Sequence, residues 1–259
     1  MTATLFSVSD GVGTITLNRP DNRNALSTEL VESLRAHLDQ AISNPSVRVI
    51  VLTGAGTVFC AGADLKERRT VTNTGVDDDL PTFVRIFQTI RSAPKPVVGK
   101  LNGSALAGGL GLACSCDITI APERAMFGFT EVRIGVAPAI ISVVCLPKLR
   151  PADAAELFLT GERITASEAA RVGLINRAVA DEALDAATDD VIAKLLLGGP
   201  KAMAASKMLL TTVPAFANEE DAFRWTAKLS GELFTSPEAA EGMGAFAAKR
   251  APNWESVIS

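Results

Sequence analysis

The chain has 259 residues, of which 47% are hydrophobic and 21% charged, as in an ordinary globular protein. Its formal net charge is −4, and the lack of a basic excess argues against a nucleic acid or an anionic membrane as partner. The N-terminal MTATLFSVSDG lacks the features of a signal peptide and no apolar run is long enough to span a bilayer, so we expect a cytoplasmic protein.

Strands and helices alternate along the first half of the chain. Apolar and polar residues alternate in GVGTITLNRP, which predicts a strand of a hairpin that turns at 11–13 and stops at Pro20. Ser27 can cap a helix over about 28–42, where apolar residues keep helical spacing. VRVIVLTG then predicts a buried strand, and FCAGADLKERR a short strand that turns at Gly62.

A polar segment follows, from Thr70 to Asp79, and it ends in three consecutive aspartates. We interpret it as a mobile loop rather than a metal site, because three consecutive residues cannot all face one ion from a helix. The next helix is expected from about Leu80 to Arg91.

The stretch between Pro96 and Pro138 is the most informative part of the chain. PVVGKLNGSALAGGLGLACSCD predicts a buried strand, a tight turn and a helix that opens at Gly108. FGFTEVRIGVAP places one carboxylate, Glu131, between an apolar strand end and a glycine turn. A strand that leads directly into a helix N-terminus points free N–H groups and a partial positive charge into the neighbouring crevice. Such donors suit a developing oxyanion and the carboxylate can move protons, so the stretch predicts enolate chemistry.

The second half begins with two short expected strands, DITIA and AMFGF, followed by helices in VCLPKL and PADAAELFLTG. A helix in ASEAARVGL is expected to start at Ser167, and INRAV is the last expected strand. Beyond Asp181 the pattern predicts only helices, and these are apolar on more than one face. Such helices must be covered by the core or by another subunit. Their expected bounds are about 183–197, 200–212, 219–234 and 237–250.

Several common sites are not indicated by the sequence. The cysteines are not spaced as CxxC and lie in apolar surroundings, which predicts buried free thiols rather than a metal site or disulfides. The single histidine, His37, is interpreted as a surface or half-buried helical residue. Because the chain has no second histidine, we expect no histidine-based metal site. AGGLG does not match a dinucleotide-binding loop, and a P-loop is absent. The four cysteines are Cys60, Cys114, Cys116 and Cys145.

Several motifs, in their order and spacing, resemble one family. They are NRPDNRNALS, FCAGADLKE, NGSALAGGLGLACSCDITIA, FGFTEVRIGVAP, LTGERITASEAARVGLINRAV and EGMGAFAAKRAPNW, which together cover nearly the whole chain. The chain is thereby identified as similar to the crotonase (enoyl-CoA hydratase/isomerase) superfamily. The resemblance implies an α/β protein with a spiral core of repeated ββα units over 1–190 and a helical trimerisation region over 191–259. It also implies a homotrimer or dimer of trimers, an acyl-CoA thioester as substrate, and no cofactor other than the coenzyme A of that substrate.

The resemblance assigns roles to individual residues. The backbone N–H groups of Ala63 and Gly108 would form an oxyanion hole, and Glu131 would be the catalytic carboxylate. A residue without Cβ at position 108 would let a thioester oxygen approach closely. Asp117 and Asp64 are interpreted as acids that hold local backbone, Asp64 by positioning the Ala63 loop. The residues expected to contact the substrate are Asn24, Ala25, Leu26, Ala61, Asp64, Lys66 and Gly111, with Phe246 and Lys249 reaching the coenzyme A of a neighbouring subunit.

The chain departs from the family pattern at one catalytic position. Hydratases of the family carry a second glutamate where this chain has Gly111. Because glycine costs about 1 kcal/mol inside a helix, we interpret Gly111 as making room for a branched or carboxylated acyl group. A bulkier run over 139–142 replaces the small residues of the family. A GLAGG-like segment followed by TEVRIGVAPAIIS resembles the branch that holds methylglutaconyl-CoA and carboxygeranoyl-CoA hydratases. Three readings stay open: a 2-enoyl-CoA hydratase, which is favoured, a Δ3-Δ2-enoyl-CoA isomerase, and a non-catalytic acyl-CoA-binding protein.

Overall fold

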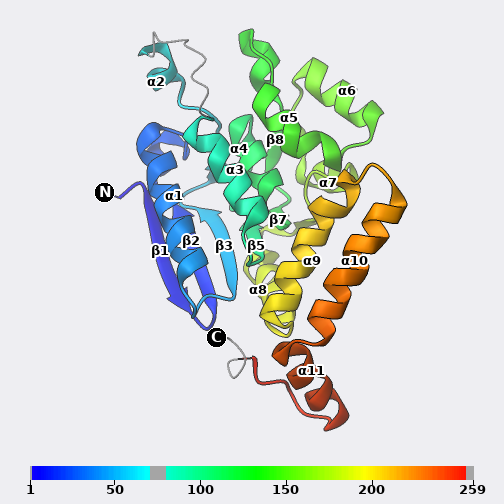
Figure 1. The fold of residues 1–259 in the computed structure, drawn as a ribbon. Helices are drawn as coiled ribbons and strands as arrows, with labels where there is room; N and C mark the ends of the chain where they lie inside the picture. Colours follow the sequence, from blue (N-terminus) through cyan, green and yellow to red (C-terminus); the bar gives the residue numbers. More distant parts are fainter. Residues whose placement is uncertain (1, 71–79, 255–259) are drawn as a thin grey trace.

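Two β-sheets organise the described residues, 2–70 and 80–254, of the computed structural model (Figure 1). The larger sheet has the order β1-β2-β3-β5-β7-β10, and all of its neighbouring strands are parallel except the β1–β2 hairpin. Its strands are β1 (Thr4–Ser9), β2 (Val12–Leu17), β3 (Val49–Gly54), β5 (Val97–Lys100), β7 (Ile118–Pro122) and β10 (Arg177–Val179). The smaller sheet has the order β4-β6-β8-β9 and consists of β4 (Val58–Cys60), β6 (Ser104–Leu106), β8 (Met126–Gly128) and β9 (Ile164–Thr165).

A strand–strand–helix unit recurs along the chain. In each of the pairs β3–β4, β5–β6 and β7–β8, the first strand joins the larger sheet and the second joins the smaller one. Helices follow each pair: α2 (Leu65–Thr70) and α3 (Thr82–Ser92), then α4 (Gly108–Ser115), then α5 (Ala139–Cys145). The predicted α/β class with a ββα spiral core is therefore confirmed. Because β4, β6 and β8 are mutually parallel, their carboxyl ends lie at one edge of the smaller sheet.

The central strands β3, β5 and β7 of the larger sheet are buried on both faces, which explains why they are almost continuously apolar. On β3, Val49 and Val51 pack with α8 (Leu184–Leu196), whereas Ile50 and Leu52 belong to the main core on the other face. Helix α1 (Thr28–Ser43) covers that core with five buried residues, and the Ser27 side chain caps it by accepting from Leu30 N–H, as predicted.

The middle of the chain differs from the sequence-based expectations at two places. The loop expected over 70–79 falls largely on residues outside the described ranges. The helix expected in VCLPKL is the end of α5 followed by a 3-10 turn, η3 (Leu146–Lys148), because Pro147 cannot continue the α-helical hydrogen bonds. The start expected at Ser167 is wrong: Thr165 caps α7 (Ala166–Arg171), since its hydroxyl accepts from Glu168 N–H at 3.2 Å. Helix α6 (Pro151–Thr160) lies between η3 and α7 in the sequence.

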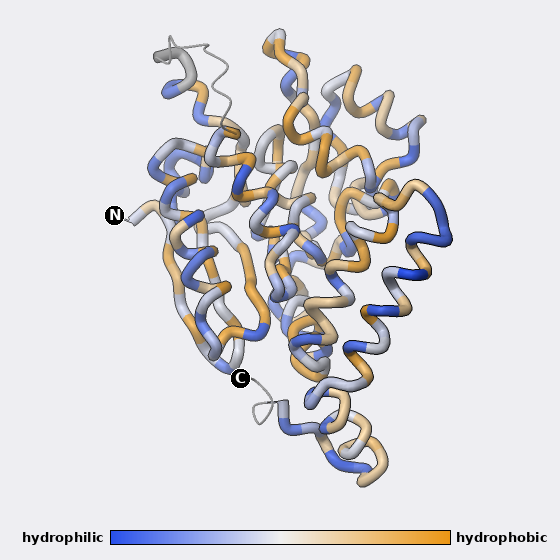
Figure 2. Tube along the Cα trace, in the orientation of Figure 1, coloured by the Kyte–Doolittle hydropathy of each residue, from blue (hydrophilic) through white to orange (hydrophobic). Residues whose placement is uncertain are grey.

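The C-terminal helices are α8, α9 (Pro200–Thr212), α10 (Glu219–Phe234) and α11 (Pro237–Ala247). Helix α8 packs on the larger sheet and runs across residues 190 and 191, so the division of the chain at that point stays a prediction. Helix α10 buries none of its residues, and hydrophilic and hydrophobic segments alternate along it (Figure 2). Figure 1 shows α10 and α11 extending away from the sheets.

A buried ion pair ties α9 to the sheet. Lys207 is only 7% exposed, and its Nζ lies 2.7 Å from Asp117 Oδ2 and donates to Ile90 O, also at 2.7 Å. Asp117 also accepts from Val97 N–H at 2.7 Å. The structural role predicted for Asp117 fits these bonds, which join β5, the turn before β7, the end of α3 and α9.

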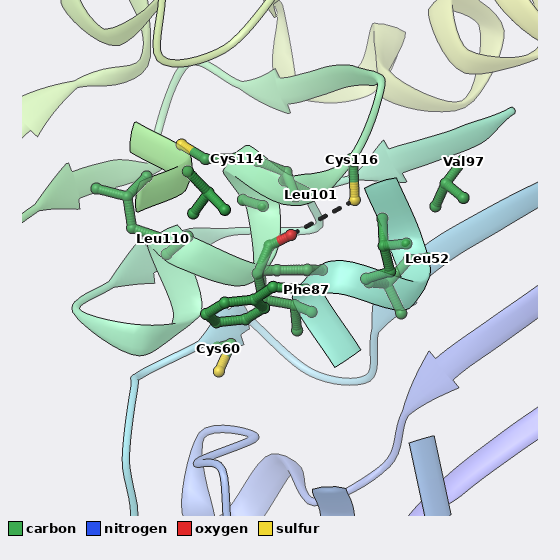
Figure 3. Close-up of a cluster of buried hydrophobic side chains, with 14 of the residues drawn as sticks. Leu52, Cys60, Phe87, Val97, Leu101, Leu110, Cys114 and Cys116 are labelled. Atoms are coloured by element: carbon green, nitrogen blue, oxygen red, sulfur yellow. Dashed lines mark hydrogen bonds between the residues drawn. The ribbon is translucent and has the colours of Figure 1, made fainter. Parts of the chain in front are cut away.

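The expected burial of free cysteines and the expected half-burial of His37 are confirmed. All four cysteines are buried and free, and Figure 3 shows Cys60, Cys114 and Cys116 among core side chains. Burial raises the pKa of the Cys60 and Cys116 thiols to about 12. His37 is half-buried, and its Nδ1 lies 2.7 Å from Thr4 Oγ1. In the described part of the chain, no helix is both long and apolar enough to cross a membrane.

Candidate active site

The site lies where three consecutive strands of the smaller sheet end. Ala63 follows β4, Gly108 follows β6 at the start of α4, and Glu131 follows β8 on the 3-10 helix η2 (Thr130–Ile134). All three residues line one cavity of about 640 Å³. The parallel pairing thus collects residues that are far apart in the sequence at one edge of the sheet, where open α/β sheets commonly bind ligands.

Two backbone donors share a wall of this cavity. Gly108 is the first residue of α4, so its N–H has no partner within the helix. Among the described residues, neither the Gly108 N–H nor the Ala63 N–H has an acceptor. A Cβ built on Gly108 would lie 3.8 Å from Ala63 N, which shows how close the two segments are. The same atom would lie 3.2 Å from Leu26 Cδ1, so a larger residue at 108 would crowd the donors.

Glu131 supplies the only carboxylate oxygen of the described residues that is buried and lacks a hydrogen-bond partner, its Oε2. Burial raises the pKa of Glu131, and a bond from its own backbone N–H offsets this only in part. A carboxylate in this state is a stronger base than an exposed glutamate, and its oxygen is available to a ligand.

A second cavity, of about 230 Å³, meets the first one at the two donors. Ala63 and Gly108 line both cavities, and Leu26, Asp64 and Phe83 line the second. A bound carbonyl oxygen at the donors would therefore have space on two sides, as a thioester with two long arms requires.

Asp64 and Asn24 hold the loops around the donors. Asp64 accepts from Asn22 Nδ2 at 2.7 Å and from Lys66 N–H at 3.0 Å. The bond from Asn22 is the main cause of the lowered pKa of Asp64, so this acid stays ionised. Asn24 is fully buried, and its side chain bonds only to backbone: to Arg19 N–H and to the carbonyls of two other residues, Ala55 and Val58. The predicted substrate contact of Asn24 is thus replaced by a bracing role, because its side chain has no surface to offer.

The expectation that Gly111 leaves space is wrong. A Cβ on Gly111 would lie 2.4 Å from Ile141 Cγ2 and 3.2 Å from Phe87 Cζ. Ile141 and Phe87 are themselves 3% and 4% exposed, so the position is a packed contact between α4, α5 and α3. The glycine accommodates the isoleucine rather than a ligand.

Of the remaining residues predicted to contact the substrate, only some lie near the donors. Ala61 lines the larger cavity, Ala25 is buried, and Lys66 is exposed at the start of α2. Phe246 lies in the last turn of α11 and Lys249 just beyond it, and neither residue lines either cavity. Figure 1 places α11 at the opposite end of the molecule from α2. Within one chain the structure does not bring these two residues to the donors.

Sequence reasoning missed two arginines of the site. Arg133 and Arg163 line the same cavity as Glu131, and neither has an ion-pair partner among the described residues. Arg133 lies against Gly161, where a Cβ would come within 3.1 Å of its Cγ. Arg133 is close to Glu131 in sequence and could have been found from that spacing. Arg163 arrives from the turn before β9, a strand that the sequence did not predict.

Known proteins are similar to this chain in both sequence and fold. The sequence profile of a family described as enoyl-CoA hydratase/isomerase matches residues 7–257. A putative enoyl-CoA hydratase of Thermus thermophilus is 37% identical over 94% of this chain and 97% of its own. An (E)-benzylidenesuccinyl-CoA hydratase of Thauera aromatica is 34% identical over 95% and 96%. A crystal structure of a putative enoyl-CoA hydratase/isomerase (crotonase) from Legionella pneumophila superposes with a TM-score of 0.89 and 34% identity, covering 98% of this chain and 99% of that one.

Proposed function

This chain belongs to the enoyl-CoA hydratase/isomerase family, and we propose that it hydrates a 2-enoyl-CoA thioester through an enolate intermediate. Family membership makes it an acyl-CoA-processing enzyme, and the reading as a non-catalytic binding protein is set aside. One observation carries the proposal: within residues 2–70 and 80–254, two N–H groups without acceptors share a cavity with a buried carboxylate oxygen that has no donor.

The proposed reaction uses all three of these groups. The thioester oxygen accepts hydrogen bonds from the N–H groups of Ala63 and Gly108, and each such donor is worth about 3–4 kcal/mol in the transition state. Glu131 takes a proton from water while the water oxygen bonds to Cβ and the C=C electron pair moves to give the enolate. Glu131 then returns that proton to Cα and is again a carboxylate. The step adds H and OH without oxidation or reduction, so we propose no cofactor beyond the substrate's coenzyme A.

We further propose that the acyl group carries a carboxylate. The two arginines of the larger cavity, Arg133 and Arg163, provide positive charge close to Glu131. A planar guanidinium binds a carboxylate through two parallel hydrogen bonds. The Thauera aromatica relative supports this class, because a succinyl thioester of the kind in its name retains a free carboxylate.

Isomerisation is the second candidate. Ile141 fills the space beside Gly111 where hydratases of the family place their second glutamate. A single carboxylate can take a proton from one carbon of a 3-enoyl-CoA and return it to another without any water. This packing therefore favours an isomerase more than the sequence alone does.

A panel of four thioesters tests these proposals: neutral and carboxylated 2-enoyl-CoA and 3-enoyl-CoA. Hydration removes the absorbance of the conjugated thioester, whereas isomerisation of a 3-enoyl substrate creates it. We expect hydration of the carboxylated 2-enoyl-CoA, with kcat/KM lowered in Arg163→Gln for that substrate and unchanged for the neutral one. Turnover of only the 3-enoyl substrates would replace hydration by isomerisation.

We propose that the chain assembles as a trimer or a dimer of trimers, in which Phe246 and Lys249 reach the coenzyme A of a neighbour. Phe246 is 87% exposed on α11, and α10 exposes Phe223 and Phe234, at 70% and 68%. These are large apolar surfaces for a helix pair that extends away from its own core. Sedimentation at micromolar concentration should give a trimer or hexamer, and a monomer would remove the role given to Phe246.

A further inference from the structure

We propose that Gly62 and Ala107 are positioning residues: packed against each other in positive-φ conformations, they set the directions of the Ala63 and Gly108 N–H groups. The inference rests on the proposed function, in which these two groups bind the thioester oxygen. The residue before each donor thereby affects the reaction, because it sets the direction of the N–H group that binds the oxygen.

Both donors directly follow a residue with positive φ. Gly62 has φ +96°, and Ala107 has φ +49° with ψ −127°. The ψ angle of a residue sets the plane of the peptide that carries the next N–H. The Ala107 conformation resembles the first central position of a type II′ turn, which is dominated by glycine because a Cβ is disfavoured there. Such strain persists only where the surroundings impose it.

Ala107 is held on both sides. Its N–H donates to Gly128 O at 3.0 Å, which ties it to the end of β8. Its carbonyl accepts from Leu110 N–H at 2.9 Å and from Gly111 N–H at 3.2 Å, in the first turn of α4. The strained residue therefore cannot relax by rotating without breaking either the strand contact or the start of the helix.

Gly62 completes the arrangement by contact. A Cβ on Gly62 would lie 2.9 Å from Ala107 Cβ, 3.0 Å from Leu106 O and 3.3 Å from Gly108 N. The Gly62 carbonyl accepts from Leu26 N–H at 2.8 Å, so its own segment is also fixed. Any side chain at 62 would push on Ala107 and on the peptide of the second donor, and both N–H directions would change together.

Gly62→Ala is the direct test, with Gly56→Ala as the matched control. Gly56 also has positive φ, +79°, and a Cβ there would come within 2.8 Å of Pro20 Cβ, but it lines neither cavity. The readout is the absorbance of bound cinnamoyl-CoA, a conjugated thioester whose band moves to longer wavelength when its carbonyl is polarised. We expect Gly62→Ala to lose most of this shift and at least ~10-fold in turnover, whereas Gly56→Ala keeps both.

Ala107→Gly tests the same inference without risk to folding, because glycine adopts this backbone conformation freely. It removes the Cβ that contacts Gly62, so we expect a smaller cinnamoyl-CoA shift and lower kcat with an unchanged Kd. If the unmodified enzyme shows the shift and both Gly62→Ala and Ala107→Gly retain it, the inference is overturned and the proposed function stands. If the unmodified enzyme shows no shift on binding, the donors do not polarise the carbonyl, and both are overturned.

Discussion

Two carboxylates in this molecule, Asp117 and Glu131, both have pKa values raised by burial, yet their surroundings differ. Asp117, at the joint between β7 and α9, accepts from Val97 N–H and pairs with Lys207, each at 2.7 Å. Glu131, at the cavity, leaves its Oε2 without a partner in the described part of the chain. Burial alone does not separate a structural acid from a reactive one. The presence or absence of a partner does.

The largest expected effect comes from removing the charge of each acid in turn. Glu131→Gln keeps the volume but removes the base, so turnover should fall ~10²–10⁴-fold, as expected for general acid–base catalysis. Binding of the CoA thioester should survive. Asp117→Asn is the matched control: it should keep the turnover of each folded molecule and lose stability instead. Steady-state kinetics with active-site titration measures the turnover of both variants. Equal losses of turnover in the two variants would remove the distinction between the two acids.

Removing the partner of Asp117 is the second test. Lys207→Met leaves a buried carboxylate unpaired, which typically costs about 3–5 kcal/mol in the free energy of unfolding. The double variant Lys207→Met/Asp117→Asn should recover part of that loss, because the uncompensated charge is gone. Denaturant titration of all three variants gives the coupling. A loss below about 1 kcal/mol in Lys207→Met would show that the pair does not hold α9.

The packed contact at Gly111 gives a smaller effect. Gly111→Ala forces a Cβ within 2.4 Å of Ile141 Cγ2, and overpacking of this kind costs about 1–3 kcal/mol. Gly231→Ala, in α10, is the matched control and should lose no stability, because no atom of the described residues lies within 4 Å of a Cβ there. Shortening the neighbour in Gly111→Ala/Ile141→Ala should cost less than the sum of the single changes. Strict additivity would mean that the two residues are independent.

The pH dependence is the smallest expected effect. Glu131 acts as a base when ionised, so the acidic limb of kcat/KM should lie above the ordinary glutamate pKa of ~4.3 and vanish in Glu131→Gln. A raised folded-state pKa means that the protonated acid stabilises the fold at low pH and that this is lost as pH rises through the folded pKa. Glu131→Gln should therefore be as stable as the parent at pH 4 and more stable at pH 7. If the unmodified protein were more stable than Glu131→Gln at pH 7, the ionised Glu131 side chain would have a stabilising partner, which would contradict the structure.

Periodicity and motifs predicted most of the elements, and the α9 and α10 bounds agree with the structure at both ends, whereas the short strands β6 and β9 were not predicted. The sequence also identified Gly108 and Glu131 as candidates, through a helix start and an isolated carboxylate. Only the family resemblance placed them in one site; periodicity could not, because the strands that bring them together, β4, β6 and β8, have three residues each. The error at Gly111 has the same origin: a missing side chain indicates space only when the neighbour is known, and Ile141 comes from another helix.

We propose that Glu131 carries the proton between water and Cα in the cavity that the two backbone donors also line. Hydration of the active 2-enoyl-CoA in deuterated water tests it most directly, with the position of the label read by NMR of the 3-hydroxyacyl product. We expect one deuterium at Cα, formed at a rate that falls ~10²–10⁴-fold in Glu131→Gln. Labelling at Cα by Glu131→Gln at the parent rate would contradict it, because another group would then deliver the proton.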